Sequence, residues 1–445
     1  METPESFVSE FTNSDELVQF FAPESLAWLA RKTGFIERVR NLTADAFMRL
    51  CAFPSFRETY PTLGQMVSEL LGLGVRMSES SLWERFEPGA VSFMREAFEQ
   101  VLKLDSTAVA AGVGHFTDLI IGDSTTLTLH PKCKDDFKGS GGGASAAGAK
   151  LQFTFGLLSA AVHEVELCHK VGSDLGHVFR DIVAGALYMF DLGYFRAANF
   201  QAIITGKAFF ISRYKYGAIL HHPDGRPIPM KVLDRYVRML KPGQTVSIPL
   251  LVFKGQKVPV RLVMTKLPRS IGDEIRRKKL TDKHNKTKNL SAERLEFCDV
   301  NAYITNLTAE QMPSESLRKL YGLRWQVEIM FKTWKSGLGL DKVRNVRSEV
   351  FQCFLYGGLI RMLLCFRIFW RAKIVFWNLN GIELSEIKGM REVANRIGKI
   401  KEWLVEGKRS KEELLSEIWL SLTKACVKEA KKGDITPFKI IKYYA

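Results

Sequence analysis

The segment from Val350 to Trp377 is the most apolar part of the chain and restricts its fold more than any other feature. A helix that spans a bilayer needs about 20 consecutive apolar residues. Here the longest uncharged stretch ends at Arg361, and Arg367, Arg371 and Lys373 interrupt the rest. We therefore predict a helix buried in a globular core, and no membrane association.

Length and charge narrow the class of protein. At about 150 residues per domain, 445 residues predict about three domains or one core with large insertions. The 64 Lys and Arg residues exceed the 48 acidic ones by 16, while apolar residues make up 46% of the chain, which is a globular composition. This charge favours a polyanionic partner, with nucleic acid ahead of an anionic membrane surface.

The N-terminal part, residues 24–104, has helical spacing and few strand signals. Leu63 to Leu71 and Ser78 to Phe86 are predicted helices separated by a glycine turn, which gives helix-turn-helix proportions. Two interpretations stay open: Arg76 and Arg85 contact DNA, or the helices simply pack together.

Strand signals begin at Asp118 with DLIIGDSTTLTL and continue with KLQFTFGLLSAAV and HEVELCHKV. Gly176 to Tyr188 is predicted to be a helix. Within the following LYMFDLGYF, a short apolar segment leads to Asp191, just before a glycine turn. Strands that alternate with a helix predict an α/β core.

Residues 205–306 contain short β-prone runs separated by turn signals such as HHPDGRP and KPGQ, and we predict a mainly β insertion there. The basic run from Lys266 to Arg294 is centred on RRKK at Arg276 to Lys279. It is either a solvated surface or a site of phosphate contact. Helical spacing resumes at Ser314, and Ser410 to Glu413 form a predicted capping box in the tail.

Other motifs exclude several classes of site. The glycine-rich stretch from Lys138 to Lys150 has Ala149 where a phosphate-binding loop requires lysine, so a flexible connector is the better interpretation. Seven scattered cysteines without a C-x-x-C pair disfavour disulfides and structural zinc. The first residues lack the features of a secretory signal, which predicts a cytoplasmic location.

The helix KLYGLRWQVEIMFKTWKSGLGL places charged groups on one stripe. In a helical projection with about 100° per residue, all members of the stripe lie between about 60° on one side of Tyr321 and about 20° on its other side. Its members are Tyr321, Arg324, Glu328, Lys332 and Lys335. The predicted core-facing residues are Leu323, Val327, Met330, Phe331, Trp334 and Leu338. From spacing alone, the stripe is either a solvated face with i,i+4 pairs or a functional surface.

The pattern Y-x2-R-x3-E-x6-K, formed by Tyr321, Arg324, Glu328 and Lys335, resembles the third catalytic segment of DDE transposases of bacterial insertion sequences, in the insertion-sequence-four family. IIGDSTTLTL and MFDLGYF resemble the segments that carry the family's two aspartates, here Asp123 and Asp191. The resemblance covers about residues 116–340.

The resemblance implies an α/β ribonuclease-H-like catalytic core interrupted by a mainly β insertion domain, with helical N-terminal and C-terminal regions. The expected divisions are a DNA-binding region at 1–112, core at 113–204, insertion at 205–310, core again at 311–378, and a tail for dimerisation or DNA binding at 379–445.

The family's chemistry is phosphodiester cleavage by two Mg²⁺ ions, for which Mn²⁺ can substitute. The resemblance assigns Asp123 to both metals, Asp191 to one and Glu328 to the other, because Mg²⁺ prefers carboxylate oxygens. Cations one turn from Glu328 would hold the phosphates of the cut strand. The expected DNA-binding residues are Tyr321, Arg324, Trp325, Lys332, Lys335, Arg213, Arg276, Arg277, Lys278, Lys279 and Arg85.

The expected function is a bacterial, nucleoid-associated transposase that binds terminal inverted repeats in double-stranded DNA. It would act as a homodimer in a synaptic complex, cut the ends, sometimes through DNA hairpins, and join the 3′ ends to target DNA. No tryptophan lies between Trp83 and Trp325. Either a Phe or Tyr occupies the flipped-base site that some relatives fill with Trp, or that step is absent here. The alternatives are a ribonuclease-H-like nuclease or recombinase without strand transfer, and an inactive DNA-binding derivative.

Overall fold

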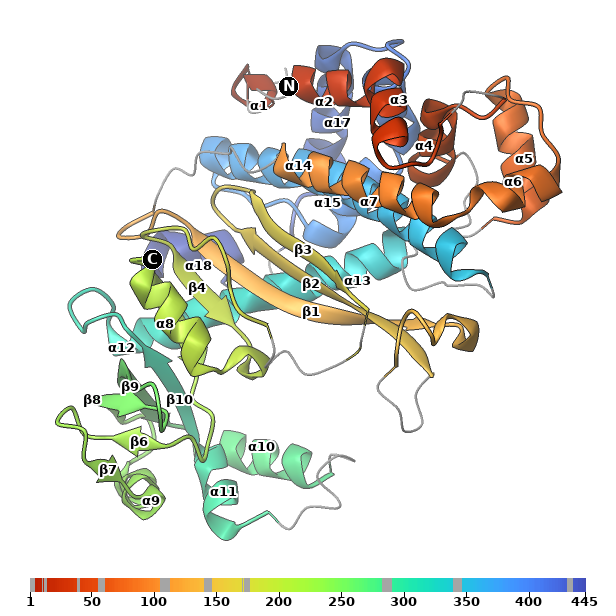
Figure 1. Ribbon diagram of the computed structural model, residues 1–445. Coiled ribbons are helices and arrows are strands. Elements are labelled where there is room, and N and C mark those ends of the chain that lie inside the picture. The colour runs from red at the N-terminus through yellow and green to blue at the C-terminus, as the bar shows by residue number, and fades with distance from the viewer. Residues whose placement is uncertain are drawn as a thin grey trace. The chain divides into compact units, whose positions relative to one another are not determined.

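The computed structural model describes residues 5–9, 11, 14–37, 41–54, 61–104, 113–139, 146–169, 171, 177–281, 290–338, 346–429 and 435–445. The chain divides into two compact units (Figure 1). Unit 1 comprises Met1–Val109, Ser124–Gly172 and Gln326–Phe438, and unit 2 comprises Ala110–Asp123, Ser173–Trp325 and Lys439–Ala445. The division therefore falls within one strand, after Asp123, and within one helical segment, after Trp325.

Unit 1 is built around helix α14 (Ser348–Asn380), the apolar segment singled out from the sequence. By length and composition it is the one described helix that could cross a membrane, but its apolar window is completely buried. It packs against the N-terminal helices α4 (Ala44–Ala52) and α7 (Pro88–Lys103) and against α15 (Glu386–Ala394) (Figure 1). The prediction of a buried core helix is confirmed.

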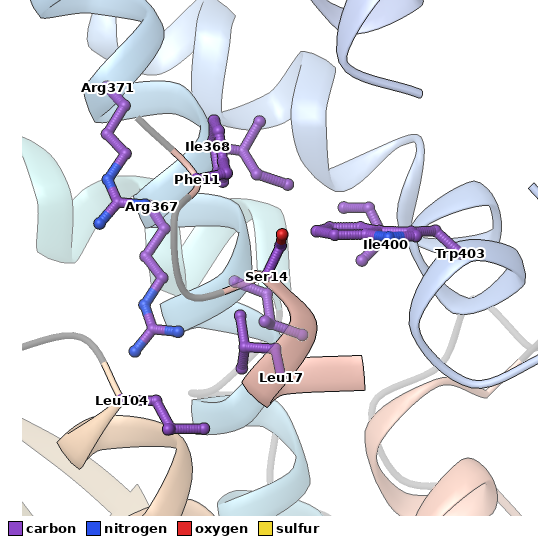
Figure 2. A pocket seen from close by; sticks show the side chains of 10 residues that line it. Phe11, Ser14, Leu17, Leu104, Arg367, Ile368, Arg371, Ile400 and Trp403 are labelled. Atoms are coloured by element: carbon purple, nitrogen blue, oxygen red, sulfur yellow. The ribbon is translucent and has the colours of Figure 1, made fainter. Parts of the chain in front are cut away.

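The charged residues of α14 are accommodated inside unit 1. The Arg367 guanidinium donates to the carbonyl of Val101, and the fully buried Lys373 forms ion pairs with Glu383 and Glu386. Figure 2 shows Arg367 and Arg371 beside a cavity that Phe11 and Trp403 also line. Its volume is about 20 Å³, enough for a water molecule and too small for a substrate.

The remaining helices of unit 1 cover this core. They are α1 (Glu5–Ser9), α2 (Ser14–Phe21), α3 (Pro23–Lys32), α5 (Leu63–Gly72), α6 (Glu79–Arg85), α13 (Trp325–Leu338), α16 (Ile397–Leu404) and α17 (Lys411–Ala425). Ser78 caps α6 by accepting from the Ser81 amide, and Ser410 and Glu413 form a capping box at α17. The two predicted N-terminal helices and the predicted capping box are confirmed.

Unit 1 also contains three strands in the order β3 (Val162–Cys168), β2 (Ala147–Gly156) and β1 (Leu119–Leu129), of which β1 contributes its residues from Ser124 onward. β2 is buried along its whole length and pairs antiparallel with β3. Residues 140–145 of the glycine-rich stretch lie outside the described residues, and Lys150 belongs to β2.

Unit 2 is organised by a mixed sheet with the strand order β1-β4-β5-β10-β9-β8-β6-β7. The first residues of β1 pair in parallel with β4 (Leu187–Phe190), which pairs in parallel with β5 (Phe209–Arg213). The other pairings, from β5 to β10 onward, are antiparallel. The remaining strands are β6 (Leu220–His221), β7 (Pro227–Ile228), β8 (Thr245–Val252), β9 (Val258–Lys266) and β10 (Val300–Thr305).

The β-prone runs predicted between residues 205 and 306 therefore form strands. β5, the first of them, continues the parallel part of the sheet next to β4. The helices of unit 2 are α8 (Ala197–Thr205), α9 (Met230–Met239), α10 (Arg269–Thr281), α11 (Ala292–Glu296), α12 (Ser314–Tyr321) and most of α18 (Pro437–Tyr444).

The helix predicted from Gly176 to Tyr188 is wrong. Residues 177–186 form turns and irregular backbone, and residues 187 and 188 already belong to β4. Asp181 and Gly185 adopt positive φ angles of 50° and 77°, which a right-handed helix does not accommodate. The apolar spacing of this segment reflects packing against the sheet, where Phe179 joins the buried cluster of unit 2.

Candidate active site

Three charged residues follow one another across the parallel strands of unit 2. The strand register pairs Gly122 of β1 with Phe190 of β4, and Phe190 with Ser212 of β5. The next residues are Asp123, Asp191 and Arg213. Asp191 keeps an extended conformation, with φ −74° and ψ 166°, so the row continues past the end of β4. Neighbouring parallel strands lie about 4.8 Å apart, and residues in register point to the same face.

This row arises from the way the strands are built. Leu119, Ile120 and Ile121 precede Asp123 and are fully buried, as are all four residues of β4. Parallel strands that are covered on both faces have continuous apolar sequences, and polar residues appear where such an apolar sequence ends. In open α/β sheets, the carboxyl ends of the strands are also where ligands bind.

Arg324 neutralises the first aspartate. Its Nη1 lies 2.8 Å from Oδ2 of Asp123, although 201 residues separate the two in sequence. The side chains are 13% and 20% exposed, so the pair is partly shielded from water but within reach of a ligand. A charge-assisted hydrogen bond of this kind fixes the carboxylate orientation.

Tyr321 supports the second aspartate. Its buried hydroxyl donates to the carbonyl of Phe190, the residue before Asp191, at 3.1 Å. Burial raises the pKa of Tyr321 well above its usual range, and the nearby Asp191 carboxylate raises it further, while Arg324 and Arg213 oppose this. The phenol therefore stays protonated and remains a donor, which positions the end of β4.

The local backbone differs from the continuous helix predicted here. α12 ends at Tyr321, a 3₁₀ turn occupies Gly322–Arg324, and α13 begins at Trp325. A 3₁₀ turn has 3.0 residues per turn, so residues three apart lie above one another. This geometry allows Tyr321 to reach the end of β4 and Arg324 to reach Asp123 in the middle of β1. Tyr321 is therefore buried and does not lie on a solvated stripe.

Helix α13 presents the remaining signature residues in unit 1. Its apolar face is buried at Val327, Met330, Phe331 and Trp334, and the last two rings contact Phe153 of β2. This agrees with the predicted core-facing side as far as Trp334, and the Leu338 side chain lies outside the described residues.

The charged residues of α13 lie partly or fully at the surface, whereas the polar Gln326 and Thr333 are buried. Glu328 is half-buried and Lys332 is exposed. The Nζ of Lys335 donates to the carbonyl of Thr126 at 3.1 Å. Lys335 is thereby attached to strand β1 three residues beyond Asp123.

Two other residues predicted to bind DNA lie elsewhere. Trp325 is 51% exposed at the start of α13, and its ring is accessible for stacking. Arg85 is half-buried at the end of α6, while Trp83 on the same helix is partly exposed and lies 4.9 Å from the guanidinium of Arg347.

The basic run on α10 is largely engaged within unit 2. Arg276 forms ion pairs with Asp273 and Asp299, and Lys278 pairs with Glu274 at 2.6 Å. Lys279 lies 3.6 Å from the sulfur of Cys298. Arg277 is exposed, and residues 282–289 of the run lie outside the described part of the chain.

Sequence reasoning missed a further set of cations on α9. These are Lys231, Arg235 and Arg238, and only their spacing marks them in the sequence. These residues are exposed, whereas Leu233, Asp234 and Val237 of the same helix are buried. The i, i+4, i+7 spacing within a β-rich segment was the signal that could have revealed them.

The two aspartates that follow the paired residues Gly122 and Phe190 suit a hard divalent cation. Their oxygens come from adjacent strands and are partly exposed, which fits Mg²⁺, an ion that binds a few carboxylates and retains water or phosphate oxygens. Asp123 and Asp191 could hold such an ion, with Arg324 balancing part of their charge.

Comparisons with known proteins identify the family of this chain. Residues 114–364, more than half of the chain, match the family described as transposase DDE domain. The transposase for insertion sequence element IS1151 of Clostridium perfringens is 26% identical, covering 96% of this chain and 95% of that protein. The transposase for IS231B of Bacillus thuringiensis subsp. berliner is 28% identical, covering 86% and 85%.

Among solved structures, a piggyBac transposase synaptic complex with hairpin DNA aligns with a TM-score of 0.44 and 12% identity, over 94% of this chain and 80% of that one, a likeness too distant to bear on the fold. The family match includes Asp123, Asp191 and Glu328, and it confirms the resemblance that the three sequence segments indicated. The chain therefore belongs to the transposase DDE domain family.

Proposed function

We propose that this protein binds the terminal inverted repeats of an insertion sequence, cleaves the ends by metal-dependent phosphodiester hydrolysis, and joins the 3′ ends to target DNA. The observation that carries the proposal is the in-register row of Asp123 and Asp191, with Arg324 paired to the first of them. Two carboxylates that directly follow the last paired residues of parallel β1 and β4 are the oxygen ligands that Mg²⁺-dependent phosphoryl chemistry requires.

Glu328 is the third carboxylate of the proposed site. It lies four residues after Arg324, about one helical turn along the chain. In this proposal Asp123 contacts two Mg²⁺ ions, Asp191 contacts one and Glu328 contacts the other. The ions would activate the attacking water or 3′-hydroxyl and stabilise the leaving oxygen. Mn²⁺ would substitute for Mg²⁺.

The cations around these carboxylates receive separate roles. Arg324 and Arg213 would bind phosphate beside the carboxylates, because guanidinium groups bind phosphate oxygens bidentately. Lys332 and Lys335 would act as point charges on the same strand, and the exposed ring of Trp325 would stack on a displaced base. Tyr321 would act as a positioning residue through its hydrogen bond to the carbonyl of Phe190.

The wider arrangement is also part of the proposal. The parallel β1-β4-β5 strands support a ribonuclease-H-like core, and the antiparallel strands that follow β5 support a β-rich insertion. Arg85 and Arg277 would contribute outer DNA contacts. The enzyme would work on bacterial DNA in the cytoplasm as a homodimer that pairs two element ends, with hairpin formation as one possible excision route.

The test uses a labelled duplex that carries a terminal repeat, a supercoiled target plasmid and Mg²⁺. The wild-type protein should nick the end and then join the label to the plasmid. Asp191→Asn should lower cleavage about 10²–10³-fold with end binding retained, since loss of a catalytic electrostatic group costs this order of rate. Asp181→Asn is the matched control, because it removes the same charge at an exposed position of unit 2.

The alternatives give different results in this assay. Nicking without joining would indicate a nuclease or recombinase and contradict the transposase. Binding without cleavage by the wild-type protein would indicate an inactive DNA-binding derivative. Full cleavage by Asp191→Asn, or by Asp123→Asn and Glu328→Gln, would contradict the carboxylate assignment.

A further inference from the structure

Most of the chain's net charge is concentrated in the β-rich part of unit 2. Residues 205–268 contain twelve Lys or Arg and two acidic residues, a net +10 of the chain's +16. Both acidic side chains are already used within the fold. Asp234 is buried and accepts from the Tyr216 hydroxyl at 3.1 Å, and Asp224 pairs with Arg226 at 2.7 Å. Ten of the twelve cations are exposed, whereas Arg261 donates to the carbonyls of Leu307 and Met312 and Lys266 pairs with Asp299.

Helix α9 arranges three of these cations in a line. At about 100° per residue, Lys231, Arg235 and Arg238 fall within about 60° of one another. The buried residues Leu233 and Val237 lie on the opposite side, where they join the core of unit 2. The helix thus buries one face and presents a basic stripe on the other.

The dimensions of this stripe suit a phosphate backbone. Seven residues of helix span about 10 Å, which corresponds to about three successive phosphates of one DNA strand at 3.4 Å of axial rise each. Arg238 pairs with Glu296 at 2.7 Å, but both side chains are about half exposed (56% and 41%). An exposed ion pair is weak and can exchange for a phosphate.

Neighbouring turns add positive charge. Lys257, in the turn between β8 and β9, donates to the carbonyl of Gly225 at 3.1 Å, which joins this turn to the one between β6 and β7. Helix α9 begins two residues after β7 ends (Figure 1). Arg226 and Lys254 are exposed on the same two turns.

We propose that the outer face of α9, formed by Lys231, Arg235 and Arg238, is a second DNA-binding surface that contacts the sugar–phosphate backbone of a duplex without reading its sequence. The proposal rests on the transposase function, because that function supplies duplex DNA as the ligand. Phosphate contacts fix the position of a protein on DNA and carry no sequence information. The surface holds the duplex outside the segment that is cut.

The experiment measures duplex binding as a function of salt. The triple variant Lys231→Gln, Arg235→Gln, Arg238→Gln is compared with the wild type on a terminal-repeat duplex and on an unrelated duplex of equal length. Each lost phosphate contact removes about 0.9 from the slope of log affinity against log salt, so the slope should fall by about 2.7. The gain in affinity between 200 and 50 mM salt should shrink about 40-fold for both duplexes.

A matched control removes the same charge from unit 1. Lys388→Gln, Lys408→Gln, Lys424→Gln changes three exposed lysines and should leave the salt slope close to that of the wild type. Cleavage by the α9 variant at saturating DNA should also be retained, since the stripe contains no proposed catalytic group. Arg235→Lys, which keeps the charge, should bind nearly as well as the wild type.

Several outcomes would overturn the proposal. They are an unchanged slope in the α9 variant, an equal loss in the control variant, and a loss confined to the terminal-repeat duplex. Tyr236→Ser with Met239→Ser tests a protein partner, because these two side chains are exposed beside the stripe. Altered sedimentation of this variant with unchanged DNA binding would assign the face to a second copy and contradict DNA binding. Failure of the wild type to cleave would affect the proposed function alone.

Discussion

Helices α9 and α10 both carry several cations, yet they use them in opposite ways. On α10 the cations are dense in sequence, and Arg276 and Lys278 pair with carboxylates of unit 2. On α9 the cations are dispersed in sequence, and the helix gathers Lys231 and Arg235 on an exposed face. Charge density along a chain therefore does not measure the charge available to a ligand. A cation held by a largely buried carboxylate, as Arg276 is by Asp299, acts on folding, and one on an exposed face can act on DNA.

The largest expected effect on stability is at Lys373 of α14, whose side chain is completely buried. Its ammonium is fully buried between Glu383 and Glu386. Lys373→Ala leaves Lys428 as the remaining cation beside the two carboxylates, and breaking a buried pair costs at most about 3–5 kcal/mol. Urea unfolding should show this loss. Lys388→Ala, at an exposed pair with Glu429, is the control and should leave the midpoint unchanged.

The same buried pair predicts a pH dependence. Burial raises the pKa of Glu386, but Lys373 and Lys428 outweigh it and hold the pKa below its usual value. Its contribution to stability is therefore present above a pH of about 4.3, the usual glutamate value. It is lost as the pH falls through the lowered pKa of the folded state. In Lys373→Ala the acid loss should begin at higher pH, and identical acid profiles would contradict the pairing.

The next effect concerns Arg324, a paired cation that we expect to act on DNA as well. Arg324→Ala removes the partner of Asp123 and a proposed phosphate ligand. Cleavage should fall about 10²–10³-fold, as for loss of a preorganised donor. Arg324→Lys should recover part of the rate, since it keeps the charge without the bidentate geometry. Single-turnover experiments measure the cleavage rates of both variants. A wild-type rate in Arg324→Ala would show that Arg324 takes no part in the reaction.

A smaller effect is expected at Arg276, where a predicted DNA ligand is engaged inside the fold. Arg276→Ala removes ion pairs with Asp273 and Asp299 and should lower stability by about 1 kcal/mol. The salt dependence of DNA binding should stay the same. A smaller salt slope with unchanged stability would show that Arg276 contacts DNA and does not stabilise the fold.

The smallest effect is expected at Lys278, whose pair with Glu274 is exposed. Lys278→Ala should change neither the urea midpoint nor the DNA affinity measurably, because exposed i,i+4 pairs contribute little. Arg277→Gln, at an exposed position on the same helix, should weaken binding slightly at low salt. Equal losses from both changes would indicate that the whole run contacts phosphate.

The sequence predicted local structure well where a single local feature, such as apolar length, a capping residue or a β-prone run, decided it. The apolar length of α14, the capping residues Ser78 and Ser410, and the β-prone runs of β8, β9 and β10 all form the expected elements. Local prediction was wrong at residues 177–186, where packing against the sheet produces apolar spacing without a helix. The predicted position of Tyr321 on the solvated side of a continuous helix was also wrong, because a 3₁₀ turn interrupts the helix.

By itself the sequence determined the identity and order of the candidate carboxylates, the burial of α14 and the excess of positive charge. Only the tertiary structure decided which of these groups meet. Strand register places Asp123, Asp191 and Arg213 side by side, and folding brings Arg324 to Asp123 across 201 residues. Helical geometry likewise gathers Lys231 and Arg235 on the exposed face of α9, while Arg276 of α10 pairs with Asp273 and Asp299. Contacts between distant residues depend on packing of the whole sheet, and local sequence patterns do not encode that packing.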